Sequence, residues 1–164
     1  MRHERQVELL RRLADGGAHQ RGLHAPASMI NPASAYTDPD RFAREQRLLF
    51  RDGPVFFALG CELRQPGDYQ AATFDGVPLV VVRQPDGGLR AMVNACRHRG
   101  APLVEPNTAG SGLRAFSCPY HAWAYDLDGA LRARPMSNGA FDDVTINCDL
   151  HQVAVAERYE MIFV

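Results

Sequence analysis

Two short fragments of this chain each place one cysteine close to one histidine, and they constrain its fold and chemistry more than any other feature. The first fragment is CRHRGAP at Cys96–Pro102, and the second is CPYHAW at Cys118–Trp123. Nineteen residues separate His98 from Cys118. Both fragments contain Gly or Pro, so each can form a loop that projects from a sheet. Two such loops side by side would bring two thiolates and two imidazoles to one site.

This set of ligands predicts a [2Fe–2S] centre of the Rieske type, in which one iron has two Cys ligands and the other has two His ligands. The predicted ligands are Cys96, His98, Cys118 and His121. Each thiolate adds a negative charge and a neutral imidazole adds none, so the site is less negative than one with four cysteines. An electron is then added at a lower electrostatic cost, and the reduction potential rises to roughly −150 to +300 mV. The function predicted from these residues is one-electron transfer.

Two other interpretations of the same residues remain open. Zinc also accepts two Cys and two His ligands, in a tetrahedral site that stabilises structure and has no redox role. The one-residue gap between Cys96 and His98 fits poorly, because paired zinc ligands are usually at least two residues apart. The four residues could also be unconnected, but the chain has only four Cys and six His, and two Cys/His pairs among so few are unexpected.

The rest of the chain after residue 50 predicts a mainly β domain. Short apolar runs alternate with turn sequences such as Gln65–Asp68 and Asp128-Gly129, without intervening helices, which is typical of an antiparallel sandwich or small barrel. The predicted strands are Val55–Gly60, Tyr69–Phe74, Pro78–Arg83, Leu89–Asn94, Leu113–Ser117, Ala124–Asp126, Leu131–Arg134, His151–Ala156 and Met161–Val164. With 164 residues, 46% of them hydrophobic, the chain can fill one core of ordinary size.

Residues 1–50 are predicted to form a short helical N-terminal arm, followed by the β domain at 51–164. Apolar residues at near-helical spacing predict a helix over residues 4–14, which Gly16-Gly17 ends. Residues 18–37 are rich in Pro, Gly, Ser and Ala and are predicted to connect the two parts. Asp38 before Pro39 suits the start of a second helix that continues to about Phe50.

Composition excludes several classes of partner. The net charge is −1, and neither nucleic acid nor an anionic membrane is expected as the main partner, since both select for a basic surface. All 18 basic residues are Arg, which hints at a GC-rich, bacterial gene. The charged N-terminus does not resemble a secretory signal, and no apolar run is long enough to cross a bilayer. A cytoplasmic location, where thiols stay reduced or bind metal, is therefore expected.

The sequence resembles the N-terminal Rieske domain of the α subunits of ring-hydroxylating oxygenases, the Rieske non-haem iron oxygenases. The resemblance covers roughly residues 40–164. It is carried by PGDY at Pro66–Tyr69, VVVRQPDGGLRAMVNACRHRGAPL at Val80–Leu103, CPYHAWAYDLDGAL at Cys118–Leu131 and the closing ERYEMIFV at Glu157–Val164. It implies a Rieske-type antiparallel β structure with a cluster-binding subdomain of two loops.

The resemblance also implies how this chain differs from other branches of the family. Respiratory Rieske proteins have an extra Cys in each loop, and the two form a disulfide; Ala101 and Tyr120 stand at the comparable positions here, which favours the lower end of the potential range. In the oxygenases, a C-terminal domain binds a mononuclear iron through two His and one carboxylate. That domain is absent from this sequence. Asp15 with His19 and His24 is the nearest match, at a different spacing, so this chain alone is not expected to hydroxylate a substrate.

Family members imply roles for the residues around the ligands. His121 would face the catalytic iron of a neighbouring subunit, and electrons would leave through it. Arg97 and Arg99 would either guide an acidic ferredoxin or reductase or be ordinary solvated arginines. The residues expected around the cluster are Arg99, Gly100, Pro119, Tyr120 and Trp123, with Tyr125 packed beneath it. Cys61 and Cys148 are expected to be buried thiols, and His3 and His151 to have no special role.

The leading functional hypothesis is therefore an electron relay in a ring-hydroxylating oxygenase. One [2Fe–2S] cluster per chain would take electrons from a ferredoxin or a flavin reductase and pass them to a mononuclear iron site on another domain or subunit. A free-standing Rieske ferredoxin is the alternative within redox chemistry, although such ferredoxins usually lack a helical arm like residues 1–50. A zinc-stabilised structural or interaction module is the alternative from another class.

Overall fold

The computed structural model describes residues 2–18, 27–135, 139, 141 and 145–164. The chain divides into two units, residues 1–39 and residues 40–164, and each is described by itself. None of the helices in the described part of the chain combines the length and the apolar character needed to span a bilayer. All the strands belong to the second unit.

Two helices form the described part of the first unit: α1 (His3–Ala18) and α2 (Ser34–Thr37). The prediction that Gly16-Gly17 would end the first helix is wrong, because α1 continues through both glycines to Ala18. A glycine costs only about 1 kcal/mol relative to Ala inside a helix, which is too little by itself to end one. The short helix α2 was not predicted. It closes on the backbone bond from the N–H of Asp38 to the carbonyl of Ser34.

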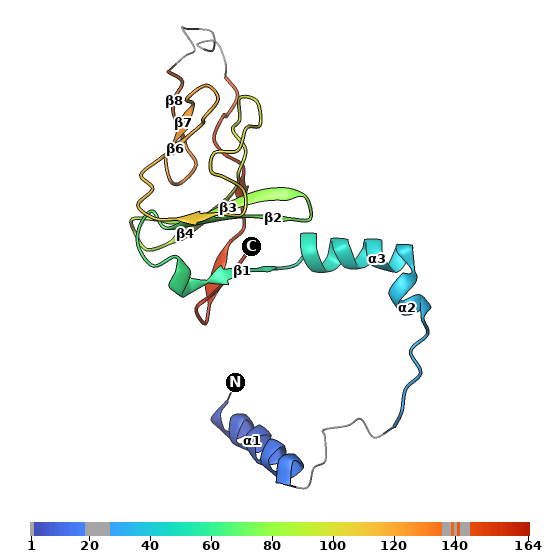
Figure 1. Cartoon of the computed structure of the whole chain (residues 1–164). Helices are drawn as coiled ribbons and strands as arrows, with labels where there is room; N and C mark the ends of the chain where they lie inside the picture. Colours follow the sequence, from blue (N-terminus) through green and yellow to red (C-terminus); the bar gives the residue numbers. More distant parts are fainter. Residues whose placement is uncertain (1, 19–26, 136–138, 140, 142–144) are drawn as a thin grey trace. The chain divides into compact units, whose positions relative to one another are not determined.

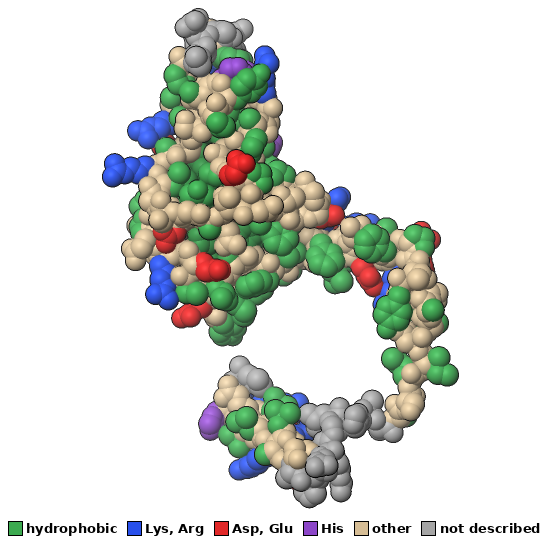
Figure 2. All heavy atoms as spheres, in the orientation of Figure 1, with side chains coloured by type: hydrophobic (Ala, Val, Ile, Leu, Met, Phe, Trp, Pro, Cys, Tyr) green, Lys and Arg blue, Asp and Glu red, His purple; other side chains and the backbone are tan. Residues whose placement is uncertain are grey.

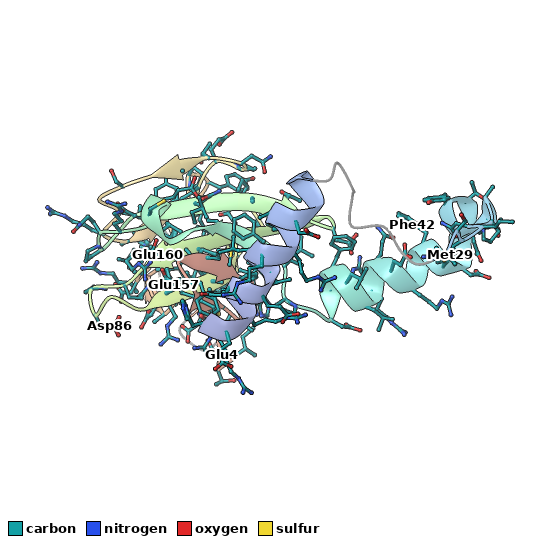
Figure 3. All side chains as sticks on the ribbon, turned by 90° about the horizontal axis from the view of Figure 1, so that it is seen from below. Glu4, Met29, Phe42, Asp86, Glu157 and Glu160 are labelled. Atoms are coloured by element: carbon teal, nitrogen blue, oxygen red, sulfur yellow. The ribbon has the colours of Figure 1, made fainter. Side chains whose placement is uncertain are left out.

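The second unit begins within α3 (Pro39–Glu45), where Phe42 is exposed (Figure 3). The predicted helix to Phe50 is only partly correct, since it continues after Glu45 as a π-helix, Gln46–Arg51. Gln46 and Arg51, five residues apart, both bond the carboxylate of Asp75, which lies in the turn after strand β2 (Tyr69–Phe74). The wider π turn places residues five apart on the same face, which explains the departure from α-helical geometry.

Eleven strands in the described residues form three antiparallel sheets (Figure 1). The first sheet has the order β1-β11-β10, with β1 at Phe56–Leu59, β11 at Met161–Phe163 and β10 at Ala156–Arg158. The second has the order β5-β2-β3-β4-β9, with these strands at Ala109–Gly110, Tyr69–Phe74, Val77–Arg83, Leu89–Val93 and Gln152–Val153. The third has the order β6-β7-β8, at Phe116–Ser117, Ala124–Tyr125 and Leu131–Ala133. The mainly β, antiparallel fold is as predicted.

Strand β3 lies at the centre of the second sheet and is buried on both faces. Successive side chains of a strand point to opposite faces, so its residues divide between two cores. Val80 and Val82 face a core that also contains the two cysteines of the loops, which we call the loop-side core. Leu79 and Val81 face a core shared with the first sheet, which we call the far-side core. The second sheet is thus the middle layer, with β6–β8 on one side and β1 on the other (Figure 1).

Two predicted strands differ from the structure. The run His151–Ala156 was predicted as one strand but forms two, because β9 pairs with β4 in the middle sheet and β10 pairs with β11 in the first sheet. The chain changes sheets between them. Of the predicted strand Leu113–Ser117, only the last two residues form a strand, β6. The two-residue strand β5 was not predicted, since it depends on its pairing with Tyr69 and Gln70 of β2.

Candidate metal centre

The first Cys/His loop follows strand β4 and is closed by two backbone hydrogen bonds at its base. The N–H of Cys96 donates to the carbonyl of Ala101 at 2.8 Å, and the N–H of Gly100 donates to the carbonyl of Cys96 at 2.8 Å. Gly100 has φ +74°, in the left-handed region that favours glycine. An added Cβ would meet no atom within 4 Å, so the backbone conformation and not the available space selects glycine here.

The second loop repeats this pattern between β6 and β7. The N–H of Cys118 donates to the carbonyl of Trp123 at 2.8 Å, and the N–H of Ala122 donates to the carbonyl of Cys118 at 3.0 Å. Ala122 has φ +56°, so the left-handed residue falls four positions after the cysteine in both loops. The loops differ in where the histidine lies, two positions after Cys96 and three after Cys118. Both predicted loops are thus present.

The structure places the two histidines of the predicted ligand set side by side and both of its cysteines in one core. The ring centroids of His98 and His121 are 4.8 Å apart, edge to face. The side chains of Cys96 and Cys118 are both buried in the loop-side core, and neither forms a disulfide. Among the described residues, no three His, Cys, Asp or Glu side chains gather closely enough for one metal ion. The donor set is therefore a pair of imidazoles and a pair of thiols in adjoining loops.

One nitrogen in this site has no partner in the protein. Nδ1 of His121 is buried and makes no hydrogen bond. Buried polar atoms are nearly always satisfied, so an exception requires an explanation such as a missing ion. A metal bound at Nδ1 would satisfy it, and the residues present therefore fit a metal group. Burial, followed by the charges of His121 and Arg99, lowers the pKa of His98 below its ordinary value, which favours the neutral imidazole that binds metals.

The hydroxyl of Tyr125 joins the first loop to strand β7. It lies 3.3 Å from Sγ of Cys96 and accepts a hydrogen bond from the N–H of Arg97 at 3.0 Å. The ring is fully buried. Burial and the bond with Cys96 raise the pKa of Tyr125 well above its usual range, so the hydroxyl keeps its proton. From the sequence Tyr125 was expected only to pack beneath the site, so this polar contact was missed.

Aromatic rings cover the two histidines unequally. The indole of Trp123 is buried and lies parallel to the imidazole of His98, with centroids 5.0 Å apart and planes at 6°. The ring of Tyr120 lies over His121, with centroids 3.8 Å apart, yet its side chain is 58% exposed. Of the other residues expected around the site, Gly100 shapes the first loop as described, and Arg99 and Pro119 are exposed on the loops.

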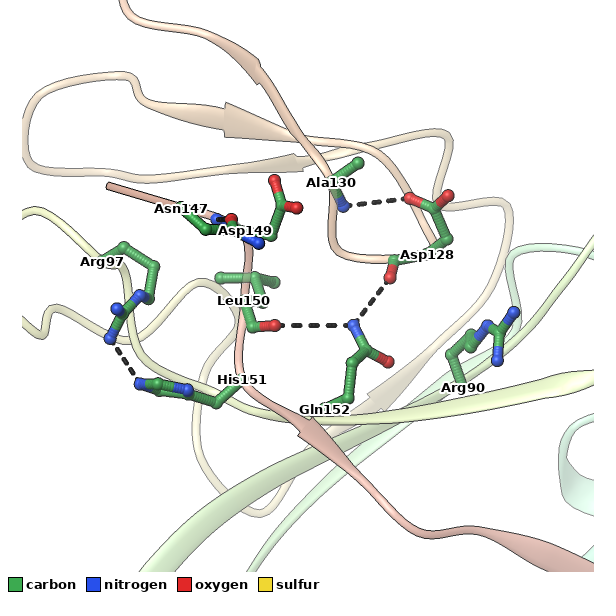
Figure 4. A pocket seen from close by; sticks show the side chains of 9 residues that line it. All are labelled: Arg90, Arg97, Asp128, Ala130, Asn147, Asp149, Leu150, His151 and Gln152. Atoms are coloured by element: carbon green, nitrogen blue, oxygen red, sulfur yellow. Dashed lines mark hydrogen bonds between the residues drawn. The ribbon is translucent and has the colours of Figure 1, made fainter. Parts of the chain in front are cut away.

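A polar hollow of about 640 Å³ lies beside the first loop (Figure 4). The guanidinium of Arg97 contacts Nε2 of His151 there, so His151 has a contact that the sequence did not suggest. Asp128 and Asp149 also line the hollow, which therefore carries charges of both signs. Acidic and basic side chains are likewise interspersed over the face of the β unit in Figure 2.

Asn94, another residue that the sequence did not single out, fixes the segment after the first loop. Its side chain is buried, and Oδ1 accepts from the N–H groups of Leu103 and Val104 at 3.0 and 3.2 Å. Nδ2 donates to the carbonyl of Val104 at 2.8 Å. A single asparagine at the end of β4 thereby satisfies three backbone groups and ties both ends of the loop together.

The remaining candidates have mixed outcomes. Cys148 is buried, as expected, but Cys61 is exposed, so that expectation is wrong. Cys61 lies in a short 3₁₀ turn, Gly60–Glu62, at the surface after β1. His19 and His24, considered with Asp15 as a metal set, lie outside the described residues.

Comparison with known proteins gives one consistent family. The family model of the Rieske [2Fe–2S] domain matches residues 54–139. The chain is 33% identical over 117 residues to the large oxygenase component of salicylate 5-hydroxylase from Ralstonia sp, covering 71% of this chain and 27% of that protein. It is 35% identical over 133 residues to the oxygenase subunit of glycine betaine monooxygenase from Chromohalobacter salexigens. This match covers 81% of this chain and 29% of that protein.

A solved structure shows the same similarity in three dimensions. A quaternary ammonium Rieske monooxygenase superposes with a TM-score of 0.71 at 31% identity, covering 80% of this chain and 36% of that one. The family-model match at residues 54–139 contains both Cys/His loops of this chain. This chain spans only 27% and 29% of the two curated relatives, so the similarity concerns one part of those longer proteins.

Proposed function

This chain belongs to the Rieske [2Fe–2S] domain family, and from that premise we propose that it relays single electrons within an oxygenase system. It is homologous to the Rieske domain of oxygenase α subunits. These relatives are named for an aromatic acid and a quaternary amine, and the segment that they share with this chain is the Rieske part. The proposal therefore concerns the electron-transfer step that this segment supports.

The ligands in this proposal are Cys96 and Cys118 for one iron and His98 and His121 for the other. The observation that carries the assignment is the buried, unpartnered Nδ1 of His121. His98 is its ring neighbour at 4.8 Å, and both thiols are buried. When bound, a [2Fe–2S] cluster accepts one electron and returns it. Tyr125 holds its proton toward the sulfur of Cys96, where a thiolate would accept the hydrogen bond.

Electrons would reach and leave this site through other proteins or domains. Relatives of this family work with a catalytic oxygenase domain and with electron donors. We propose a ferredoxin or a flavin reductase as the donor and a mononuclear-iron oxygenase domain or subunit as the acceptor. The solved relative is described as revealing inter-subunit electron transfer, which supports an acceptor on a neighbouring subunit. Four cysteines outside any disulfide suit the reducing cytoplasm.

Metal analysis combined with spectroscopy tests this function. Protein purified without oxygen should be red-brown, contain iron and inorganic sulfide in equal amounts, and give a rhombic EPR signal after dithionite. His121→Ala and Cys118→Ala should abolish the signal, whereas His151→Ala, a histidine outside the ligand pairs, should keep it. Wild-type protein that lacks iron and sulfide would overturn the proposal. A colourless protein with one zinc per chain would instead identify the structural module.

A further inference from the structure

The His98 side of the site is covered by a small cluster of rings. Trp123 lies parallel to His98, and Phe141 meets both of these rings edge to face. The centroid of Phe141 is 5.7 Å from that of His98 and 5.3 Å from that of Trp123. The three rings therefore contact one another in a closed triangle. Phe141 comes from a part of the chain after β8, so another interaction must hold it against the loop.

Arg134, which follows β8, makes that interaction. Its guanidinium lies 5.3 Å from the centroid of Trp123 and 5.9 Å from that of Phe141. Its Nη1 also donates a hydrogen bond of 3.0 Å to the carbonyl of Phe141. One side chain thus holds the backbone at residue 141 and contacts the rings of residues 123 and 141. A guanidinium can do both because it is planar, weakly hydrated and carries several donors, whereas an ammonium is a compact, strongly hydrated charge.

We propose that Arg134 is a positioning residue that clamps Trp123 and Phe141 over His98 and limits the access of water to this side of the site. On the His121 side, the ring that lies over the histidine is that of Tyr120, which is more than half exposed, whereas Trp123 is buried. Both histidines are themselves half-buried, so the two sides differ in the ring that covers each histidine. The consequence for the cluster rests on the function proposed above, while the clamp itself is a property of the folded chain.

The chain offers a matched control two residues away. Arg132 lies on β8 itself, is 61% exposed and pairs with Asp126 at 3.6 Å, outside the ring cluster. Arg132→Gln removes the same charge from the same strand region without touching the clamp. Arg134→Gln removes the charge and the guanidinium, and Arg134→Lys keeps the charge but loses the planar fork of donors. Far-UV circular dichroism confirms that each variant is folded, and Arg134→Lys decides the matter if Arg134→Gln does not fold.

Fluorescence measures the clamp without relying on the cluster, because Trp123 is the only tryptophan in the chain. Acrylamide quenching is measured on the whole chain as purified and again after the iron has been removed. Both Arg134 variants lose the guanidinium that contacts the two rings and the carbonyl of Phe141 at the same time. This loss should raise the quenching constant about threefold in both variants and shift the emission to longer wavelength. Arg132→Gln should behave as the wild type. A wild-type quenching constant in Arg134→Lys or in folded Arg134→Gln would overturn the proposal.

The second measurement follows the cluster itself. Under a fixed excess of an iron chelator, the visible absorbance should bleach about threefold faster in both Arg134 variants than in the wild type or Arg132→Gln. Equal bleaching rates in all four proteins would refute the clamp while leaving the electron-transfer function intact. If the wild-type protein contains no iron and sulfide, the proposed function fails, and the fluorescence comparison still decides whether the clamp exists.

Discussion

At the scale of single residues, the hydroxyl of Tyr125 is the contact that most directly affects a bound cluster. Its oxygen accepts from the N–H of Arg97 and lies 3.3 Å from the sulfur of Cys96, to which it would donate when that sulfur is a thiolate. Hydrogen bonds to cluster sulfurs stabilise the reduced, more negative state and raise the reduction potential. One hydroxyl therefore couples the packing of β7 to the redox property of the first loop.

Tyr125→Phe should lower the reduction potential of the cluster and lower the free energy of unfolding by about 1 kcal/mol. The potential falls because the sulfur loses its donor, and stability falls because the N–H of Arg97 loses its acceptor. Potentiometric titration followed by EPR measures the first effect, and urea unfolding the second. Tyr159→Phe removes a hydroxyl from a side chain that is 89% exposed and should change neither. An unchanged potential in Tyr125→Phe would contradict the expectation.

The candidate ligands could be predicted from the sequence because each Cys/His pair lies within one short loop. The partners of those ligands could not. Tyr125 is 29 residues from Cys96, and it was predicted to pack but not to bond, since its hydroxyl meets the sulfur only when β7 lies against the first loop. Asn94 was missed for a related reason, because its three backbone partners lie 9 and 10 residues further along, in a segment without regular structure. Contacts between residues far apart in the sequence form only when the chain folds, and the local spacing of residues does not predict them.

At the scale of elements, the two Cys/His loops have the same backbone conformation but different residues at the position with positive φ. The first uses Gly100, and the second uses Ala122 at φ +56°. A non-glycine residue in this conformation costs roughly 1–2 kcal/mol. The sequence placed both loops but gave no sign of this strain, because alanine is not a signal for a left-handed conformation.

Ala122→Gly should therefore stabilise the protein by roughly 0.5–1 kcal/mol, the relief of strain exceeding the added freedom of the unfolded chain. Thermal unfolding of the cluster-loaded protein should show a higher midpoint. Ala101→Gly is the matched control in the first loop, because Ala101 does not have a positive φ. It gains the same unfolded freedom without relieving strain, so its midpoint should fall. A lower midpoint for Ala122→Gly would show that the alanine is not strained there.

Among the strands, the long strands of the middle sheet were predicted well, because each is a continuous apolar run bounded by turn residues. The exceptions share a cause. Strands β9 and β10 follow each other closely but pair with different sheets, and β5 consists of two residues whose extended state depends on β2. The π-helix after Glu45 similarly depends on Asp75. Each of these elements was missed because its structure depends on the strand or side chain that it contacts, and not on its own sequence.

At the scale of the whole β unit, a partly buried ion pair joins the middle sheet to the first sheet. The guanidinium of Arg83, at the end of β3, lies 2.9 Å from the carboxylate of Glu157 on β10. Glu157 is labelled in Figure 3. The guanidinium also donates to the carbonyls of Leu63 and Gly87. The side chain of Arg83 is only 10% exposed, whereas that of Glu157 is 34% exposed. Water can therefore reach the carboxylate, but it scarcely reaches the guanidinium or the buried bond to Leu63.

Arg83→Met should lower the free energy of unfolding by about 2 kcal/mol, because the carbonyl of Leu63 loses its donor in a buried place and two partly solvated acceptors lose theirs as well. Urea unfolding measures the loss. Arg90→Met, an exposed arginine on the neighbouring strand β4, should stay within about 0.5 kcal/mol of the wild type. A loss for Arg83→Met no larger than for Arg90→Met would mean that solvent replaces the lost bonds.

Because the side chains of β3 alternate between the two cores, the β unit should tolerate a substitution in this strand better than a deletion. Replacing Val80 by another aliphatic residue affects the packing near the loops, and replacing Val81 affects the opposite core, so each compartment can be altered separately. Deleting a single residue from β3 would instead exchange the two sets of side chains, and both compartments would lose their fit at once. Point substitutions in β3 can therefore adjust the environment of the cluster without unfolding the unit. A change in the length of this central strand cannot, because it would disrupt both cores.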